Sequence, residues 1–213
     1  MQNEVIDILT KVGAILPNDH FVGTSGRNFD TYINKDMLYP HTAETSRICE
    51  LFAERHKDLP IEAVAAPALG GIILSQWTAH HLSKVKGREV LGIYAEKISD
   101  GLALTRGYDR FVKGKKVLVV EDLTTTGGSL QKVIEAVKGA GGNVLAACVM
   151  VNKSPSTVTA ETIGVPFSAL AELVVETYVA AECPMCKSGV PINTTIGHGK
   201  KFLEQMQNSR SDA

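Results

Sequence analysis

Four short apolar runs alternate with longer amphipathic segments through the middle of the chain. The runs are rich in Val, Ile and Ala, and this length and composition predict buried strands. They lie at residues 63–66, 90–95, 116–120 and 144–151. Between them, residues 72–82 and 129–140 carry apolar positions at helical spacing. Strands and helices in this alternation predict an α/β fold, with a central parallel sheet covered by helices on both faces.

The two ends of the chain predict smaller attachments to this core. Residues 3–12 and 42–56 have the spacing of amphipathic helices, and the turn-rich segment at 20–34 closes with a short strand at Tyr32-Ile33. After about residue 180 the composition shifts to Cys, Pro, Gly and Asn. We therefore expect an N-terminal hood at 1–40, a core at 41–180 and a C-terminal appendage at 181–213.

Composition and charge exclude several classes of protein. Of the 213 residues, 44% are hydrophobic and 21% are charged, and the formal net charge is -1. This balance argues against non-specific binding to nucleic acid or to an anionic membrane. No apolar run reaches the roughly 18 residues of a membrane-spanning helix, and the N-terminus lacks the pattern of a signal peptide. We therefore expect a cytoplasmic protein with neither a nucleic acid nor a membrane as partner.

The strand at 116–120 opens the stretch that is most informative about chemistry, Val117-Leu-Val-Val-Glu-Asp-Leu-Thr-Thr-Thr-Gly-Gly-Ser129. The C-terminal end of this strand places Glu121 and Asp122 at the edge of the sheet. Small residues then precede a helix. The N–H groups of a helix N-terminus, with nearby hydroxyls, suit a phosphate. Adjacent carboxylates suit vicinal hydroxyls, or a magnesium ion held partly by oxygens of a ligand. Together they predict a ribose 5-phosphate site, whereas the plainer alternative is a capped helix with incidental acids.

This stretch resembles the phosphoribosyl pyrophosphate (PRPP) signature of the type I phosphoribosyltransferase family. Residues 20–151 are most similar to its orotate branch, on the segments Phe21-Val-Gly-Thr-Ser-Gly-Arg27 and Pro67-Ala-Leu-Gly-Gly-Ile72. The resemblance implies magnesium-dependent transfer of a phosphoribosyl group from PRPP to a nucleobase, with release of pyrophosphate, by a homodimer. The expected base is orotate, which gives orotidine 5-phosphate in pyrimidine synthesis. A purine or other base, or a non-catalytic regulator that senses PRPP, is the alternative.

The resemblance also implies roles for individual residues. Glu121 and Asp122 would bind the ribose, with Asp122 reaching magnesium through PRPP. Lys97 and Arg106, in a loop at 97–110 that closes over the neighbouring subunit in relatives, would neutralise the pyrophosphate. The expected substrate-binding residues are Leu123, Thr124, Thr125, Thr126, Gly127, Gly128 and Ser129 for the 5-phosphate, Leu69, Gly70 and Gly71 for pyrophosphate, and Ser25, Arg27 and Lys153 near the base.

Four departures from the orotate pattern concern charged positions. Thr24 and Gly70 stand where orotate enzymes usually carry lysines, and Lys153 stands in place of an arginine. The loop of orotate enzymes usually carries several basic residues close together. Here it has only Glu96-Lys97 at its start, and the next arginines are Arg106 and Arg110. Because the carboxylate of orotate needs a cationic or amide partner, these changes keep the other bases open. Arg27 and Lys153 are the remaining candidates for that partner.

The cysteines raise a separate question. Cys183-Pro-Met-Cys186 has the spacing of half a zinc site, and His198 is a candidate third ligand for Zn²⁺. A redox pair, or two ordinary thiols in a C-terminal turn, are the alternatives. Cys49 and Cys148 fall on apolar faces of a predicted helix and strand, so we expect both in the core.

Overall fold

The computed structural model describes residues 1–23, 25–99 and 101–211, with side chains to residue 206. It divides the chain into two compact units. The first contains Met1–Val12 and Lys35–Val174, and the second contains Gly13–Asn34 and Val175–Ala213. These boundaries differ from those expected at residues 40 and 180. The first helix belongs with the core, whereas the turn-rich segment after it folds together with the C-terminal part of the chain.

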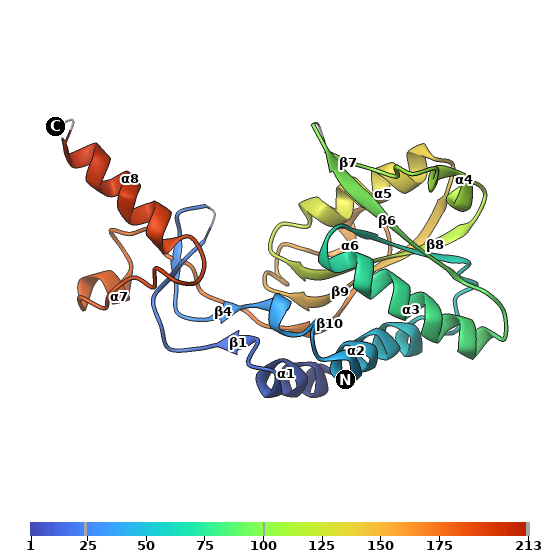
Figure 1. Ribbon diagram of the computed structural model, residues 1–213, viewed down its shortest axis with the longest axis horizontal. Helices are drawn as coiled ribbons and strands as arrows, with labels where there is room; N and C mark the ends of the chain where they lie inside the picture. Colours follow the sequence, from blue (N-terminus) through green and yellow to red (C-terminus); the bar gives the residue numbers. More distant parts are fainter. Residues whose placement is uncertain (24, 100, 212–213) are drawn as a thin grey trace. The chain divides into compact units, whose positions relative to one another are not determined.

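The first unit is built on a six-stranded sheet with the strand order β10-β9-β8-β5-β6-β7 (Figure 1). All neighbouring strands are parallel except the β6–β7 pair. This confirms the predicted α/β fold. The strands are β5 (Ala63–Pro67), β6 (Leu91–Ile98), β7 (Gly101–Ala103), β8 (Lys116–Thr124), β9 (Asn143–Asn152) and β10 (Phe167–Glu172).

Helices cover both faces of this sheet. α2 and α3 pack against each other on one face, and α5 covers the other with an apolar stripe that begins at Leu130 (Figure 1). α3 is the longest with 17 residues, and no helix in the described part of the chain is long and apolar enough to cross a membrane. The helices are α1 (Gln2–Lys11), α2 (Thr42–Arg55), α3 (Gly70–Lys86), α4 (Asp109–Val112), α5 (Gly128–Gly139) and α6 (Ala160–Ile163), with a 3₁₀ turn, η1, at Lys35–Met37.

The second unit consists of two small antiparallel pairs and two helices. β1 (Ile15–Leu16) pairs with β4 (Tyr32–Ile33), and β2 (Phe21–Val22) pairs with β3 (Asn28–Phe29). The rings of Phe21, Phe29 and Tyr32 contact one another. The helices are α7 (Pro184–Lys187) and α8 (Gly199–Ser211). Its buried apolar side chains, among the described residues, are Ala14, Phe21, Val22, Ile33 and Cys183.

Candidate active site

The central sheet reverses its winding direction between β5 and β8. From β5 the chain passes through α3 to β6, and from β8 it passes through α5 to β9 on the opposite side. In open parallel sheets, ligands bind at the carboxyl ends of the strands at such a point. The loops that follow β5 and β8 are the two segments expected to bind pyrophosphate and the 5-phosphate. The topology therefore brings these two segments to neighbouring strands at one end of the sheet.

The acid pair lies within β8 rather than after it, because Glu121, Leu123 and Thr124 continue the parallel pairing with β9. Both carboxyl side chains are buried. Asp122 accepts hydrogen bonds at Oδ2 from Lys35 Nζ (2.8 Å) and from the Tyr39 hydroxyl (2.9 Å). Its Oδ1 accepts one from the Leu123 backbone N–H (2.7 Å). The carboxylate of Asp122 is thus held by a cation and by a hydroxyl that no pattern in the sequence distinguishes.

The electrostatics of this cluster follow from its burial. Burial, and then the charge of Asp122, raise the pKa of Glu121 well above its ordinary value. Burial alone would lower the pKa of Lys35, but the charge of Asp122 and the hydrogen bond to it raise that pKa overall. Burial and the same carboxylate raise the pKa of Tyr39. Lys35 therefore stays charged and Tyr39 stays a hydrogen-bond donor, while Glu121 retains its proton to a higher pH than an exposed glutamate does.

The loop after β8 forms a tight entry into α5. The buried hydroxyl of Thr124 accepts a hydrogen bond from the Gly127 N–H (2.9 Å), which closes the turn. Gly127 has φ +79°, and a Cβ there would lie 2.6 Å from Ile163 Cδ1. The side chains of Thr125 and Thr126 are exposed, and the first N–H groups of a helix have no partner within it. The loop and the exposed Ser129 can therefore offer hydroxyl and backbone donors to a phosphate.

The loop after β5 brings the N-terminus of α3 against Asp122. The peptide bond between Ala68 and Leu69 is cis, and the Leu69 side chain is exposed. A Cβ at Gly70 would lie 2.7 Å from Asp122 Oδ2 and would overlap the Tyr39 hydroxyl. A glycine is required there because the carboxylate and the hydroxyl occupy the space of any side chain. Gly71, the next residue, packs closely on β5 in the same way. The positive end of the α3 dipole thus approaches the acid pair.

The segment expected as a loop at 97–110 begins with an antiparallel hairpin. β6 and β7 pair so that Lys97 lies opposite Leu102, and Lys97 is exposed. Arg106 forms an ion pair with Glu96 (2.8 Å), and the Thr105 hydroxyl is hydrogen-bonded to the same carboxylate. In this conformation the guanidinium of Arg106 is therefore engaged within the hairpin.

The residues expected near the base fall into both units. Lys153 follows β9, and its backbone N–H donates to the Thr124 carbonyl oxygen (2.9 Å) at the start of the phosphate loop. Burial lowers the pKa of Lys153, and the charge of Asp122 partly opposes this shift. Ser25 and Arg27 belong to the second unit, where Arg27 donates to the Thr177 hydroxyl (2.9 Å) and carbonyl (2.7 Å). Thr24 lies outside the described residues.

The structure corrects the expected partner of the two cysteines. His198 is exposed, and its backbone N–H donates to the Val22 carbonyl oxygen. The histidine beside the thiols is His20, whose Nε2 lies 3.7 Å from Sγ of both Cys183 and Cys186. Among the described residues, His198 is not part of the candidate ligand group, whereas the fold brings His20 to the cysteines from the other end of the chain.

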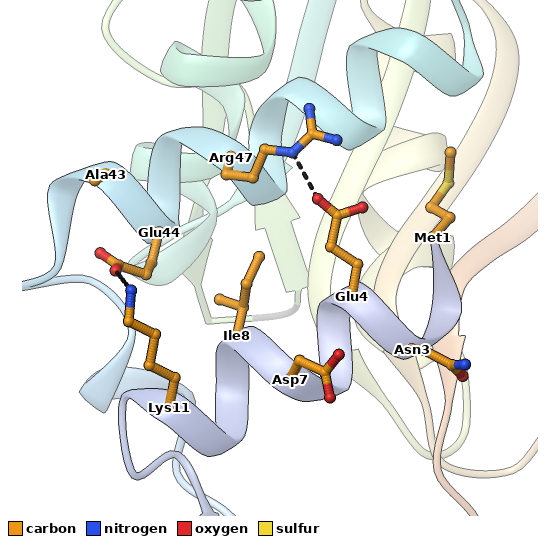
Figure 2. Close-up of a pocket in the computed structure, with 9 residues that line it drawn as sticks. All are labelled: Met1, Asn3, Glu4, Asp7, Ile8, Lys11, Ala43, Glu44 and Arg47. Atoms are coloured by element: carbon orange, nitrogen blue, oxygen red, sulfur yellow. Dashed lines mark hydrogen bonds and ion pairs between the residues drawn. The ribbon is translucent and has the colours of Figure 1, made fainter.

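A surface pocket between α1 and α2 is distinct from these groups (Figure 2). Two ion pairs join its walls, Lys11 with Glu44 (2.7 Å) and Arg47 with Glu4 (2.7 Å). None of its lining residues belongs to the signature stretch or to the loop after β5. The pocket therefore does not change the assignment of the site to the carboxyl ends of β5 and β8.

Comparisons with known proteins bear on this site. A family model described as the phosphoribosyl transferase domain matches residues 34–163. The chain is 34% identical over 191 residues to the orotate phosphoribosyltransferase of Caldanaerobacter subterraneus, which covers 90% of this chain and 95% of the relative. It is 37% identical over 190 residues to that of Desulforamulus reducens, with 89% and 94% covered. A crystal structure of orotate phosphoribosyltransferase from Aeropyrum pernix superimposes with a TM-score of 0.64 at 27% identity, over 79% of this chain and 93% of that one.

Proposed function

The chain belongs to the phosphoribosyl transferase domain family, and on that premise we propose that it transfers the 5-phosphoribosyl group of PRPP to orotate. Pyrophosphate is released and orotidine 5-phosphate is formed. Relatives that carry the orotate phosphoribosyltransferase name match about nine-tenths of the chain. The observation that carries the proposal is the buried Glu121–Asp122 pair beside a phosphate-type loop, at the point where the sheet reverses its winding direction.

The reaction itself needs no covalent intermediate with the protein. The bond between ribose C1 and the pyrophosphate oxygen breaks, and a bond between C1 and a ring nitrogen of orotate forms. Positive charge develops on the ribose ring while negative charge grows on the pyrophosphate. The protein therefore acts by electrostatic stabilisation, by orientation of the reactants and by exclusion of water.

Each part of the site has a task in this reaction. Thr125, Thr126 and Ser129 hold the 5-phosphate, with the backbone N–H groups at the start of α5. Glu121 and Asp122 bind the ribose hydroxyls, which replace Lys35 and Tyr39 as partners of Asp122. Binding through these remote groups orients C1 without taking part in the chemistry.

The leaving group is received by the loop after β5 and by nearby cations. Backbone N–H groups at Leu69, Gly70 and Gly71 face the pyrophosphate, and Lys97 and Arg106 add positive charge when the hairpin closes. Arg106 must then exchange Glu96 for the pyrophosphate. Lys153, beside the phosphate loop and partly buried, is the cation proposed for the carboxylate of orotate.

Magnesium fits the donor set of this site. Mg²⁺ prefers oxygen ligands, and Glu121 and Asp122 supply carboxylate oxygens at one strand end. When bound with PRPP, the ion neutralises part of the charge of the pyrophosphate. We also propose that the enzyme works in the cytoplasm as a homodimer, in which the 97–110 hairpin of one subunit serves the site of the other.

The test is release of pyrophosphate from PRPP and magnesium with orotate, uracil, adenine, hypoxanthine, guanine and xanthine. We expect turnover with orotate, and a Lys153→Met variant should raise the KM for orotate more than the KM for PRPP. Turnover with a purine instead would move the assignment to a purine enzyme. PRPP binding without turnover on any base would indicate a PRPP sensor, and absence of PRPP binding would refute the placement of the site.

A further inference from the structure

The second unit gathers three metal-ligand side chains from distant parts of the sequence. His20 precedes β2, while Cys183 and Cys186 lie at the start and within the single turn of α7. One ligand atom from each of the three lies within 4.8 Å of the others. His20 and Cys183 are buried, and Cys186 is partly buried. The cluster therefore joins the N-terminal and C-terminal segments of the unit at a point shielded from water.

The imidazole of His20 is oriented as a ligand. Its Nδ1 lies 2.8 Å from the Val190 carbonyl oxygen, which can only accept a hydrogen bond. Nδ1 therefore carries a proton, and Nε2 is the ring nitrogen on the side of the two sulfur atoms, 3.7 Å from each. Histidines that bind metals commonly give their other N–H to a backbone carbonyl in this way, which fixes the tautomer and the direction of the ring.

Asn28 supplies an independent observation at the same point. Its side chain is fully buried, and its Nδ2 has no hydrogen-bond partner within the described residues. Its Oδ1 lies 2.8 Å from His20 Nε2 and 4.0 Å from Cys186 Sγ. The first of these distances is that of a hydrogen bond, so Asn28 borders the cluster on the side of His20. A buried polar side chain with one unsatisfied atom therefore lies directly beside the candidate ligand atoms.

We propose that His20, Cys183 and Cys186 bind one zinc ion, with the Asn28 side chain beside the fourth coordination position. Thiolate and imidazole ligands favour zinc over magnesium or calcium. On binding, both thiols lose their protons to solvent, and two Zn–S bonds and one Zn–N bond form. The charges of the two thiolates and of Zn²⁺ cancel, so the occupied site adds no net charge to the buried cluster.

The small core of this unit gives the ion a structural task. Only a few apolar side chains are fully buried there, and small units of this kind usually need a metal or disulfides for stability. The ion would fix the β2–β3 hairpin, which carries Asn28, to the turn of α7. Ser25 and Arg27 lie in the connection of that hairpin, so zinc would also order a segment expected near the base.

The first measurement is the zinc content of the full chain, expressed without a histidine tag and purified under reducing conditions. We expect about one zinc per chain in the wild type, and under about 0.1 in Cys183→Ser, Cys186→Ser and His20→Gln. His198→Gln and Cys148→Ala are the matched controls and should keep their zinc. In the cobalt-substituted protein, sulfur-to-cobalt charge-transfer absorption should appear and should be lost in either cysteine variant.

Wild-type protein also provides a test that does not depend on the folding of any variant. Removal of zinc by a chelator should lower the melting temperature, and added zinc should restore it. The proposal is overturned if the reduced wild type holds under about 0.1 zinc per chain after incubation with zinc. It is also overturned if His198→Gln loses the metal while His20→Gln retains it. Neither readout uses phosphoribosyl transfer, so failure here leaves the proposed reaction untouched.

Discussion

Asp122 shows how a single residue can serve both stability and the proposed chemistry. In the free protein its buried carboxylate is satisfied by Lys35 and Tyr39. An unpaired buried carboxylate would be costly, so these partners make the acid pair compatible with folding. The same two groups must release Asp122 when the ribose hydroxyls bind. The site therefore exchanges one set of hydrogen-bond donors to Asp122 for another.

The substitution Asp122→Asn tests this role because it removes the charge and preserves the size of the side chain. We expect kcat/KM for PRPP to fall on the order of 100-fold, as is typical when one stabilising group of an active site is lost. Pyrophosphate release measures this. Glu172→Gln, at the exposed end of β10 in the same sheet, is the matched control and should leave kcat/KM unchanged. Equal activity of Asp122→Asn and the wild type would remove Asp122 from the mechanism.

The raised pKa of Glu121 predicts that the stability of the folded protein depends on pH. Because its pKa is raised in the folded protein, the native state binds this proton more tightly than the unfolded chain does. The free energy of unfolding therefore falls as pH rises from the unfolded pKa, about 4.3, toward the folded pKa. Glu121→Gln cannot ionise and should lack this contribution.

Urea denaturation of both proteins across the pH range gives the comparison. The stability of Glu121→Gln relative to the wild type should rise with increasing pH. Glu172→Gln again serves as the control, because its carboxyl is exposed. A difference between Glu121→Gln and the wild type that stays constant with pH would show that Glu121 does not titrate within the range.

At the scale of elements, the hydrophobic pattern predicts the strands whose apolar residues follow one another along the chain. The apolar runs that became β5, β6, β8 and β9 were identified because each is continuous and bounded by turns. β10 was missed, since Phe167-Ser-Ala-Leu-Ala-Glu172 mixes small and polar residues and gains its pairing only from β9. β8 extends to Thr124 for the same reason, because the ladder with β9 holds polar residues in the strand.

The residues of the site also fall into two groups, those that are neighbours in the sequence and those that the fold brings together. The acids and the loop after them form one continuous stretch, so their proximity could be predicted from sequence. Lys35 and Tyr39 reach Asp122 across more than 80 residues, and no local pattern distinguishes them. His20 lies 163 residues from Cys183, and the nearer His198 therefore looked like the better ligand. Contacts made only by the tertiary fold account for each of these misses.

The glycines at the two ends of α5 offer a matched pair of substitutions. Gly127→Ala places a side chain at φ +79° and against Ile163, so we expect a loss of about 1–2 kcal/mol in stability and weaker PRPP binding. At Gly139 a Cβ meets nothing within 4 Å, and Gly139→Ala should be neutral or slightly stabilising. Thermal unfolding and PRPP titration measure both. If the two variants bind PRPP equally well, the turn at Gly127 does not shape the phosphate loop.

At the scale of the whole molecule, the division into two units changes how its stability is understood. The length and the 44% hydrophobic content of the complete chain suggest an ample core. The buried apolar residues lie mostly in the first unit, around the sheet, and the second unit has few. An average over the chain therefore conceals a small unit that depends on other contacts, among them the proposed zinc site.

The proposed dimer makes the last prediction, which concerns where the 97–110 hairpin acts. If Lys97 serves the neighbouring subunit, a heterodimer of Lys97→Ala and Asp122→Asn subunits contains one site with both residues intact and one with neither. Such a heterodimer, isolated through a different tag on each subunit, should have about half of the wild-type activity, because a two-fold dimer has two equivalent sites. Each mutant homodimer should be nearly inactive. If the hairpin serves its own subunit, both sites of the heterodimer carry a defect and activity stays at the level of the homodimers. A fully active monomer would likewise exclude exchange between subunits, and Lys97 would then have to reach the pyrophosphate from within its own chain.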